Sequence, residues 1–163
     1  MGKDDFREDL ITFSLLMGII STFIKSIITV IPYYLKITNS MIILDIGKTI
    51  FNIDKVPTDP GHIILAFIGH LGFGGILAIG LSLVLLKTGT DFYYIKGGFY
   101  GVFVWLTLRN GLITVGMPGR PEPLDLITAV FSLISHVVYG LMLAYLIIKY
   151  NKFIRGTPGL PKK

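Results

Sequence analysis

The chain has 163 residues, of which 52% are hydrophobic and only 15% are charged. An ordinary soluble domain carries about 25% charged residues. Together with a mean hydropathy of +0.71, the composition leaves too few polar groups to cover a soluble surface. It therefore excludes a soluble globular protein and a disordered one. The absence of cysteine also excludes disulfides, thiolate metal sites and cysteine nucleophiles.

The net charge of +5 fits Lys and Arg beside anionic lipid better than a nucleic-acid footprint. No basic stripe with interleaved aromatic residues lies outside the apolar segments. We therefore predict membrane lipids as partners and no nucleic acid. The N-terminal sequence lacks the basic start and small-residue cleavage site of a signal peptide, so the first apolar segment is predicted to stay as a helix.

Four apolar segments predict an all-α fold, a bundle of four transmembrane helices. A helix needs about 20 mainly apolar residues to cross about 30 Å of hydrocarbon, and an isolated span must satisfy its backbone hydrogen bonds internally. The predicted helices cover residues 10–31, 62–86, 97–117 and 124–148. Pro32 and Pro118 are predicted to stop the first and third of them.

The connection between the first two spans contains a further apolar segment, residues 40–51, which is too short to span. We predict an interfacial or re-entrant helix there. The run Thr58-Asp59-Pro60 is typical of a helix N-cap followed by proline at the first helical position. Residues 1–150 are thus predicted to form one membrane domain, and residues 151–163 a disordered basic tail.

The distribution of Lys and Arg predicts the orientation of the bundle. Nine of these residues lie in the N-terminal segment, the loop near residues 87–96 and the C-terminal tail, and four lie on the opposite side. We therefore predict a multi-pass protein of the cell membrane with both termini in the cytoplasm.

The second and fourth predicted helices share a pattern, a histidine followed by an aromatic residue and then glycine, at 70–74 and 136–140. The first and third helices share a cation, then Ile-Thr-Val, then proline. These matches predict a tandem repeat of one hairpin, with the two copies related by an axis along the membrane normal. Chance is the alternative interpretation, because Leu, Ile, Val and Gly are so frequent in these segments.

Four ionisable residues fall inside the predicted spans, and each costs roughly 2.5 kcal/mol or more in hydrocarbon. They are Lys25, His70, Arg109 and His136. At about 1.5 Å per residue, they lie at similar depths, so they are candidates for one buried polar layer that binds a ligand. No Asp or Glu lies deep in any of these segments.

Other interpretations of these four residues stay open. The histidines lie in stripes of small residues and fit simple helix packing, and the two cations fit snorkelling to the interface. Lys25 and Arg109 also fit an anion site for a phosphate or a carboxylate. Two histidines on different helices fit axial ligation of haem in an electron-transfer protein.

The layout resembles a group of small four-helix membrane proteins of clostridial-type, spore-forming bacteria, loosely YqhR-like. The resemblance rests on Ile24-Lys25-Ser26, Asp45-Ile46-Gly47, Trp105 and the run His136-Val-Val-Tyr139-Gly140. The resemblance implies a bacterial cell membrane and no assigned activity, and it transfers no catalytic residue.

No motif typical of a hydrolase, a metalloprotease or a phosphate-binding loop occurs in the sequence. We therefore expect a protein that is not an enzyme, with no metal site and no cofactor, which binds a lipid, a small molecule or a membrane partner through the polar layer. The alternatives are the haem protein above and an accessory subunit of a larger membrane complex. Association with a membrane-protein partner or a second copy of the chain is part of the same expectation.

Overall fold

The computed structural model describes residues 3–51, 58–114 and 124–150, and the side chains within 10–51, 58–108 and 124–150. All regular structure in this part of the chain is helical. The helices are, in order, α1 (Lys3–Tyr34), α2 (Ile42–Phe51), α3 (Pro60–Thr88), α4 (Tyr93–Thr114) and α5 (Leu126–Tyr150). Three of them contain stretches that are long and apolar enough to cross a membrane, Leu10–Tyr34, Pro60–Thr88 and Leu126–Tyr150.

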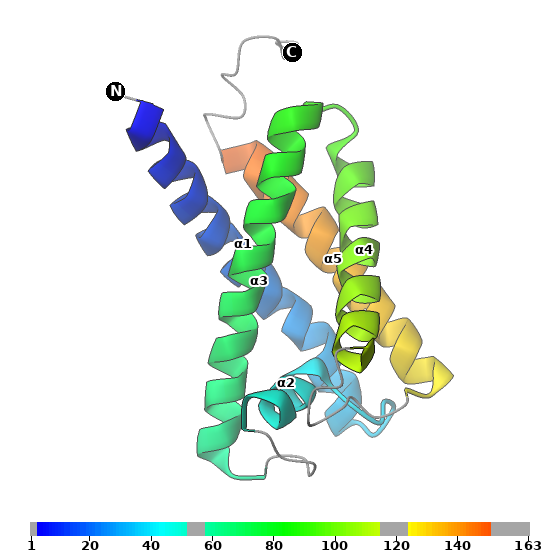
Figure 1. Cartoon of the computed structure of the whole chain (residues 1–163). Helices are drawn as coiled ribbons and strands as arrows, with labels where there is room; N and C mark the ends of the chain where they lie inside the picture. The colour runs from blue at the N-terminus through cyan, green and yellow to red at the C-terminus, as the bar shows by residue number, and fades with distance from the viewer. Residues whose placement is uncertain (1–2, 52–57, 115–123, 151–163) are drawn as a thin grey trace.

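The long helices form a bundle, with α2 lying across one end (Figure 1). We call this the α2 end. The start of α1, the end of α5 and the turn between α3 and α4 lie at the opposite end. Helix α1 packs along α3 and against α5, and α4 packs along α5. Helices α3 and α4 make few contacts, although they are joined by a short turn, and they separate toward the α2 end.

The prediction that Pro32 stops the first helix is wrong, because α1 continues through it to Tyr34. Two residues after the end of the helix, Lys36 has a left-handed backbone with φ of 57°. The Ile37 amide donates to the Pro32 carbonyl (2.9 Å), and the Lys36 amide donates to the Tyr33 carbonyl (3.0 Å). These two bonds form a Schellman cap, which satisfies the last carbonyls without glycine. Proline removes one helical hydrogen bond, and the cap that follows completes the end of the helix.

The starts of two long helices are capped by aspartate. The Asp59 carboxylate accepts from the His62 amide (3.1 Å), with Pro60 at the first helical turn, so the predicted N-cap is confirmed. Asp125 accepts in the same way from the Thr128 amide (2.8 Å). Hydrogen bonds from the side chain and the backbone of Thr128 hold the pKa of Asp125 below its usual value.

The turn between α3 and α4 is shorter than predicted, because α4 begins at Tyr93 and not at Gly97. The Lys96 ammonium donates to the Thr88 and Gly89 carbonyls (2.9 and 2.8 Å). A cation at this position satisfies the last carbonyls of α3 and complements its dipole. The stop predicted at Pro118 and the tail 151–163 lie outside the described residues.

The predicted segment 40–51 forms a short helix at the end of the bundle. Helix α2 packs on α3, and its Ile43, Leu44, Asp45 and Lys48 are buried. The predicted short helix between the first two spans is confirmed and lies across the bundle end (Figure 1), whereas an interfacial or re-entrant placement stays a prediction.

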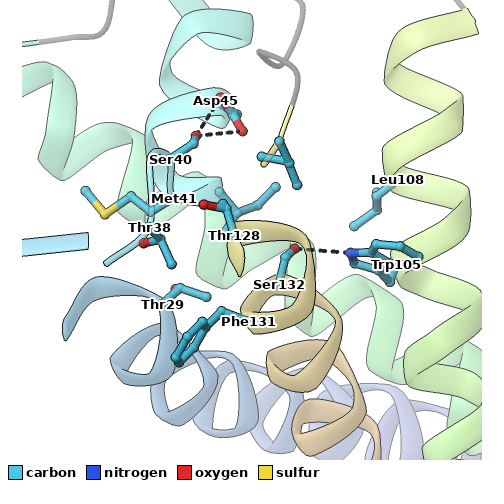
Figure 2. Close-up of a pocket in the computed structure, with 12 residues that line it drawn as sticks. Thr29, Thr38, Ser40, Met41, Asp45, Trp105, Leu108, Thr128, Phe131 and Ser132 are labelled. Carbon is cyan, nitrogen blue, oxygen red and sulfur yellow. Dashed lines mark hydrogen bonds between the residues drawn. The ribbon is translucent and has the colours of Figure 1, made fainter. Parts of the chain in front are cut away.

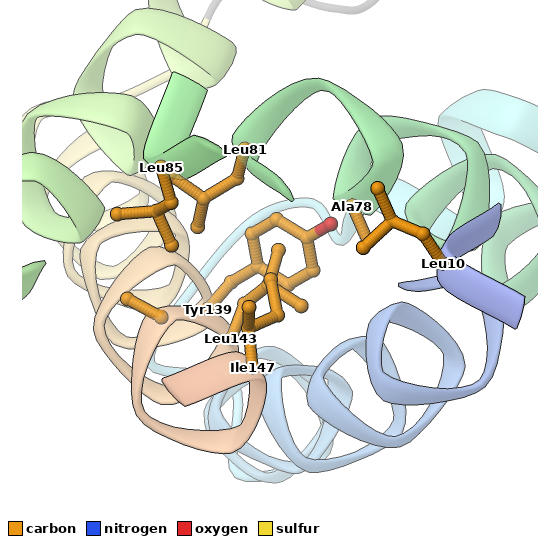
Figure 3. Packing of buried hydrophobic residues seen from close by; sticks show 8 residues of the cluster. Leu10, Ala78, Leu81, Leu85, Tyr139, Leu143 and Ile147 are labelled. Atoms are coloured by element: carbon orange, nitrogen blue, oxygen red, sulfur yellow. The ribbon is translucent and has the colours of Figure 1, made fainter. Parts of the chain in front are cut away.

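The apolar core lies toward the end of the bundle opposite α2, where α1, α3 and α5 meet (Figure 3). Leu81, Leu143 and Ile147 are fully buried there around the ring of Tyr139. Two serines also join α1 to α3 in this region. The Ser14 hydroxyl donates to the Leu10 carbonyl (2.6 Å), so in its 2.7 Å contact with Ser82 it is the acceptor.

Glycines set the distance between the helices of each packed pair. A Cβ built on Gly18 of α1 lies 2.6 Å from the Ala78 Cβ of α3, and one built on Gly97 of α4 lies 2.7 Å from the Ala144 Cβ of α5. Small residues let the backbones approach closely, which is the main way that helices associate in lipid. The α1–α3 and α4–α5 pairs thus use the same kind of contact.

We predict that Gly97→Ala destabilises the bundle by about 1–3 kcal/mol, because the new methyl group overpacks the α4–α5 contact. Gly98→Ala is the matched control, since a Cβ there meets only a Leu141 methyl group at 3.7 Å. It should be neutral or stabilise by up to about 1 kcal/mol, as alanine favours a helix over glycine. Unfolding of both variants in detergent measures the difference. Equal effects would contradict close packing at Gly97.

Candidate functional site

Lys25 and His136 form a buried polar pair between α1 and α5. Only 4% of Lys25 and 2% of His136 is exposed. The Lys25 Nζ atom lies 3.0 Å from His136 Nε2, and 5.8 Å from the centroid of the Tyr139 ring. The structure thus brings together two of the residues that the sequence singled out, from segments more than 100 positions apart.

The surroundings of His136 fix the direction of this hydrogen bond. His136 Nδ1 lies 2.7 Å from the Ser132 carbonyl oxygen, which can only accept, so Nδ1 carries a proton. In the neutral ring Nε2 is then the acceptor, and Lys25 donates to it. The Ser135 hydroxyl donates to the same carbonyl (2.7 Å), and Trp105 Nε1 donates to the Ser132 hydroxyl (3.1 Å). His136 is therefore held on both sides.

His70 is the exception in this layer. Its side chain is only 4% exposed, and its Nε2 atom has no hydrogen-bond partner among the described residues. The hydroxyl of Thr22, a residue only 1% exposed, also has none. Buried polar atoms are nearly always satisfied, and an unsatisfied one costs about 1–3 kcal/mol. These two atoms are therefore candidates for contact with ordered water or a ligand.

Both atoms belong to residues that line a cavity of about 250 Å³, which we call the central cavity. All five helices contribute to its walls. Thr22, Lys25 and His70 form a polar part, and most of the remaining lining is aliphatic or aromatic, including Ile46, Phe73, Leu77, Val104 and Leu108. The cavity lies where α3 and α4 separate, so side chains of both helices face it across the gap.

A second, smaller pocket of about 40 Å³ lies beside it toward the start of α5 (Figure 2). Its lining includes Thr38, Ser40, Asp45 and Thr128. The Ser40 hydroxyl lies 3.4 Å from both Asp45 carboxylate oxygens. The Thr38 hydroxyl is buried without a partner. This pocket has the size and the polar partners of a site for ordered water.

Two side chains, Ile42 and Leu108, line both spaces. They separate the small hydroxyl-lined pocket from the central cavity. The hydroxyl-lined pocket and the central cavity are therefore neighbours inside the α2 half of the bundle.

Of the four predicted site residues, Lys25 and His136 are in contact and His70 lines the same cavity as Lys25. The side chain of Arg109 lies outside the described residues. The sequence did not single out Thr22 or Tyr139. Tyr139 donates to the Gly74 carbonyl (2.6 Å) and so links α5 to α3 at the edge of the cavity. The repeated histidine, aromatic and glycine pattern contained this tyrosine, but gave no sign of its partner.

Three candidate membrane spans and a set of buried serine and threonine side chains define the class of protein. It is a helical, multi-pass membrane protein. No family model, curated protein or solved structure matches the chain. The resemblance to the YqhR-like group therefore stays a prediction.

The residues do not fit a haem held by two histidines. Both ring nitrogens of His136 are engaged within the protein, with Ser132 and Lys25. The central cavity of about 250 Å³ is also smaller than the roughly 300–1,000 Å³ of sites for drug-sized ligands, and haem is at least of that size.

We predict that Lys25 and His136 are energetically coupled. Lys25→Met and His136→Leu each leave the other residue with an unmet hydrogen bond, so each should destabilise by about 1–3 kcal/mol. The double variant should cost less than the sum of the two. A double-mutant cycle on unfolding in detergent measures the coupling, with exposed Thr107→Val as a control expected to change stability by less than about 0.5 kcal/mol. Additive effects would contradict the contact.

Proposed function

We propose that this protein binds an apolar or amphiphilic small molecule, such as a single-chain lipid, in the central cavity. The observation that supports this most is the His70 Nε2 atom, which is buried without a partner in the wall of a largely apolar cavity. Ligand sites combine mostly apolar walls with a few polar groups that orient the ligand. The central cavity has this composition, since Thr22, Lys25 and His70 supply the polar groups.

The position of the cavity supports a ligand that comes from the membrane. Two members of its lining, Ile50 of α2 and Phe73 of α3, are exposed on the outside of the bundle. The cavity is therefore nearest the surface on the side of α2 and α3. An apolar molecule dissolved in the bilayer would reach this side without crossing water.

In this proposal α4 is a fourth span, and both termini lie in the cytoplasm as the positive-inside rule indicates. The 22 residues of α4 match the length of a crossing. The start of α1 and the end of α5 lie at one end of the bundle (Figure 1), as an even number of crossings requires. Binding, and not catalysis, is proposed because the polar side chains of the described lining are an amine, an imidazole, two threonine hydroxyls and a phenol, with no carboxylate among them.

The similar packing of α1–α3 and α4–α5 supports the proposed hairpin repeat. Gly18 of α1 and Gly97 of α4 occupy equivalent positions in the two hairpins, since each faces a small residue of the helix that it packs against. Lys25 lies seven residues after Gly18, whereas Arg109 lies twelve after Gly97. Aligning Gly18 with Gly97 therefore places α1 and α4 in a different register from the one given by their shared Ile-Thr-Val runs.

The role as an accessory subunit stays a prediction, which co-purification from the native membrane addresses.

Filling the cavity should prevent binding. Val104 is buried and lines the cavity, whereas Leu106 of the same helix is 45% exposed. We predict that Val104→Trp abolishes the retention of a ligand by the purified protein, and that Leu106→Trp does not. Native mass spectrometry of both variants and the parent chain, released from lipid nanodiscs, measures the bound mass. Retention of the same ligand by both variants, or by neither, would contradict binding in the central cavity.

A further inference from the structure

A buried ammonium group is stabilised by an anionic partner, and the described part of the chain gives Lys25 none. No Asp or Glu of the described residues forms an ion pair with it, and its one hydrogen bond goes to the neutral ring of His136. An unpaired charge in an apolar interior is costly. The described residues therefore place an amine at the cavity wall without supplying a counterion, and an anionic ligand would stabilise its protonated form.

The few polar side chains of the central cavity include hydrogen-bonding groups that the described residues leave unused. An ammonium group has three donors, and Lys25 uses one of them for His136. The hydroxyl of Thr22 and the Nε2 atom of His70 have no partner. All three residues line the same cavity from α1 and α3. The Lys25 amine, and the Thr22 hydroxyl and His70 imidazole once their side chains rotate toward the cavity, can hydrogen-bond a ligand oxygen placed between them.

The remaining walls and the volume limit what can be attached to that oxygen. Ile46, Phe73, Leu77 and Val104 give apolar walls. An apolar cavity of about 150 Å³ already holds a benzene molecule, so a volume of about 250 Å³ has room for one short hydrocarbon chain. It is too small for a phospholipid with two acyl chains.

We propose that the ligand is a single-chain amphiphile with a carboxylate head, which binds between Lys25, His70 and Thr22 with its chain against the apolar wall. This inference rests on the proposed function and specifies its ligand class. A carboxylate carries one negative charge and two acceptor oxygens, which match the single cation among the described residues of the lining. A phosphate monoester carries up to two charges and calls for a second cation.

The test uses three probes with the same chain and different heads, namely decanoate, decanol and decyl phosphate. Each is titrated into the protein in phosphatidylcholine nanodiscs, with empty nanodiscs as the partitioning control. We expect saturable decanoate binding at least tenfold tighter than that of decanol. Lys25→Met should weaken decanoate binding at least tenfold and change decanol binding less than twofold. Leu106→Trp, on the outside of the bundle, should change neither.

Thr22→Val provides a variant that keeps the fold. Its shape is close to that of threonine, and the hydroxyl that it removes has no partner in the protein, so stability should not fall. Decanoate binding should weaken several-fold. An unchanged decanoate affinity in both Thr22→Val and His70→Leu would overturn the placement of the head group.

The remaining outcomes separate this inference from the proposed function. Equal affinities for decanoate and decanol would overturn the carboxylate site and leave an apolar binding cavity. Tighter binding of decyl phosphate would overturn it in favour of a phosphate head. Saturable binding of none of the three probes would overturn the inference, whereas the proposed function is tested separately by the mass measurement on the parent chain and the two tryptophan variants.

Discussion

The bundle depends on one constraint, that a polar group inside a membrane helix must find its partner within the protein. Most buried hydroxyls of the described chain do so locally. Ser14, Ser26 and Ser135 each donate to a carbonyl one turn earlier in their own helix. Such bonds let polar side chains lie between helices at little cost. The exceptions to this pattern are therefore informative, because the same chain shows how readily a hydroxyl can be satisfied.

Two of the exceptions, Thr22 and His70, lie beside Lys25 on the central cavity. His136 differs from His70, although the sequence pattern around the two is the same. His136 donates to a carbonyl and accepts from an amine, whereas His70 Nε2 bonds to nothing in the described chain. One histidine thus orients the lysine, and the other stays available to a ligand. This difference between equivalent residues is what favours a binding site over simple helix packing.

Much of this arrangement follows from the sequence. Polar side chains in apolar helices must face inward, which was enough to predict that Lys25, His70 and His136 lie inside the bundle. The N-cap at Asp59 and the short helix after the first span were also readable from local patterns. The end of α1 could not be predicted in this way, because the effect of Pro32 is offset by hydrogen bonds that form only once the following residues fold back.

The cavity itself could not be predicted, since it arises from packing between helices. A stripe of small residues predicts that two helices approach, but not which two or where they separate. Helices α1 and α3 meet at Gly18, and α4 and α5 meet at Gly97. No comparable contact draws α3 and α4 together in the α2 half of the described bundle. The volume left between them is enclosed by α1, α2 and α5, so side chains from all five helices line it.

The same geometry explains why the polar groups face the cavity and not the lipid. Lys25 is seven residues after Gly18 on α1, close to two helical turns, and so lies on the face that packs into the bundle. His70 is four residues before Gly74, which faces Thr22 across the α1–α3 contact, and so shares the inner face of α3. The glycine contacts that hold the two pairs of helices together thereby also direct the amine and the imidazole into the gap that the pairs leave open. Packing and the proposed ligand binding would both follow from one placement of small and polar residues.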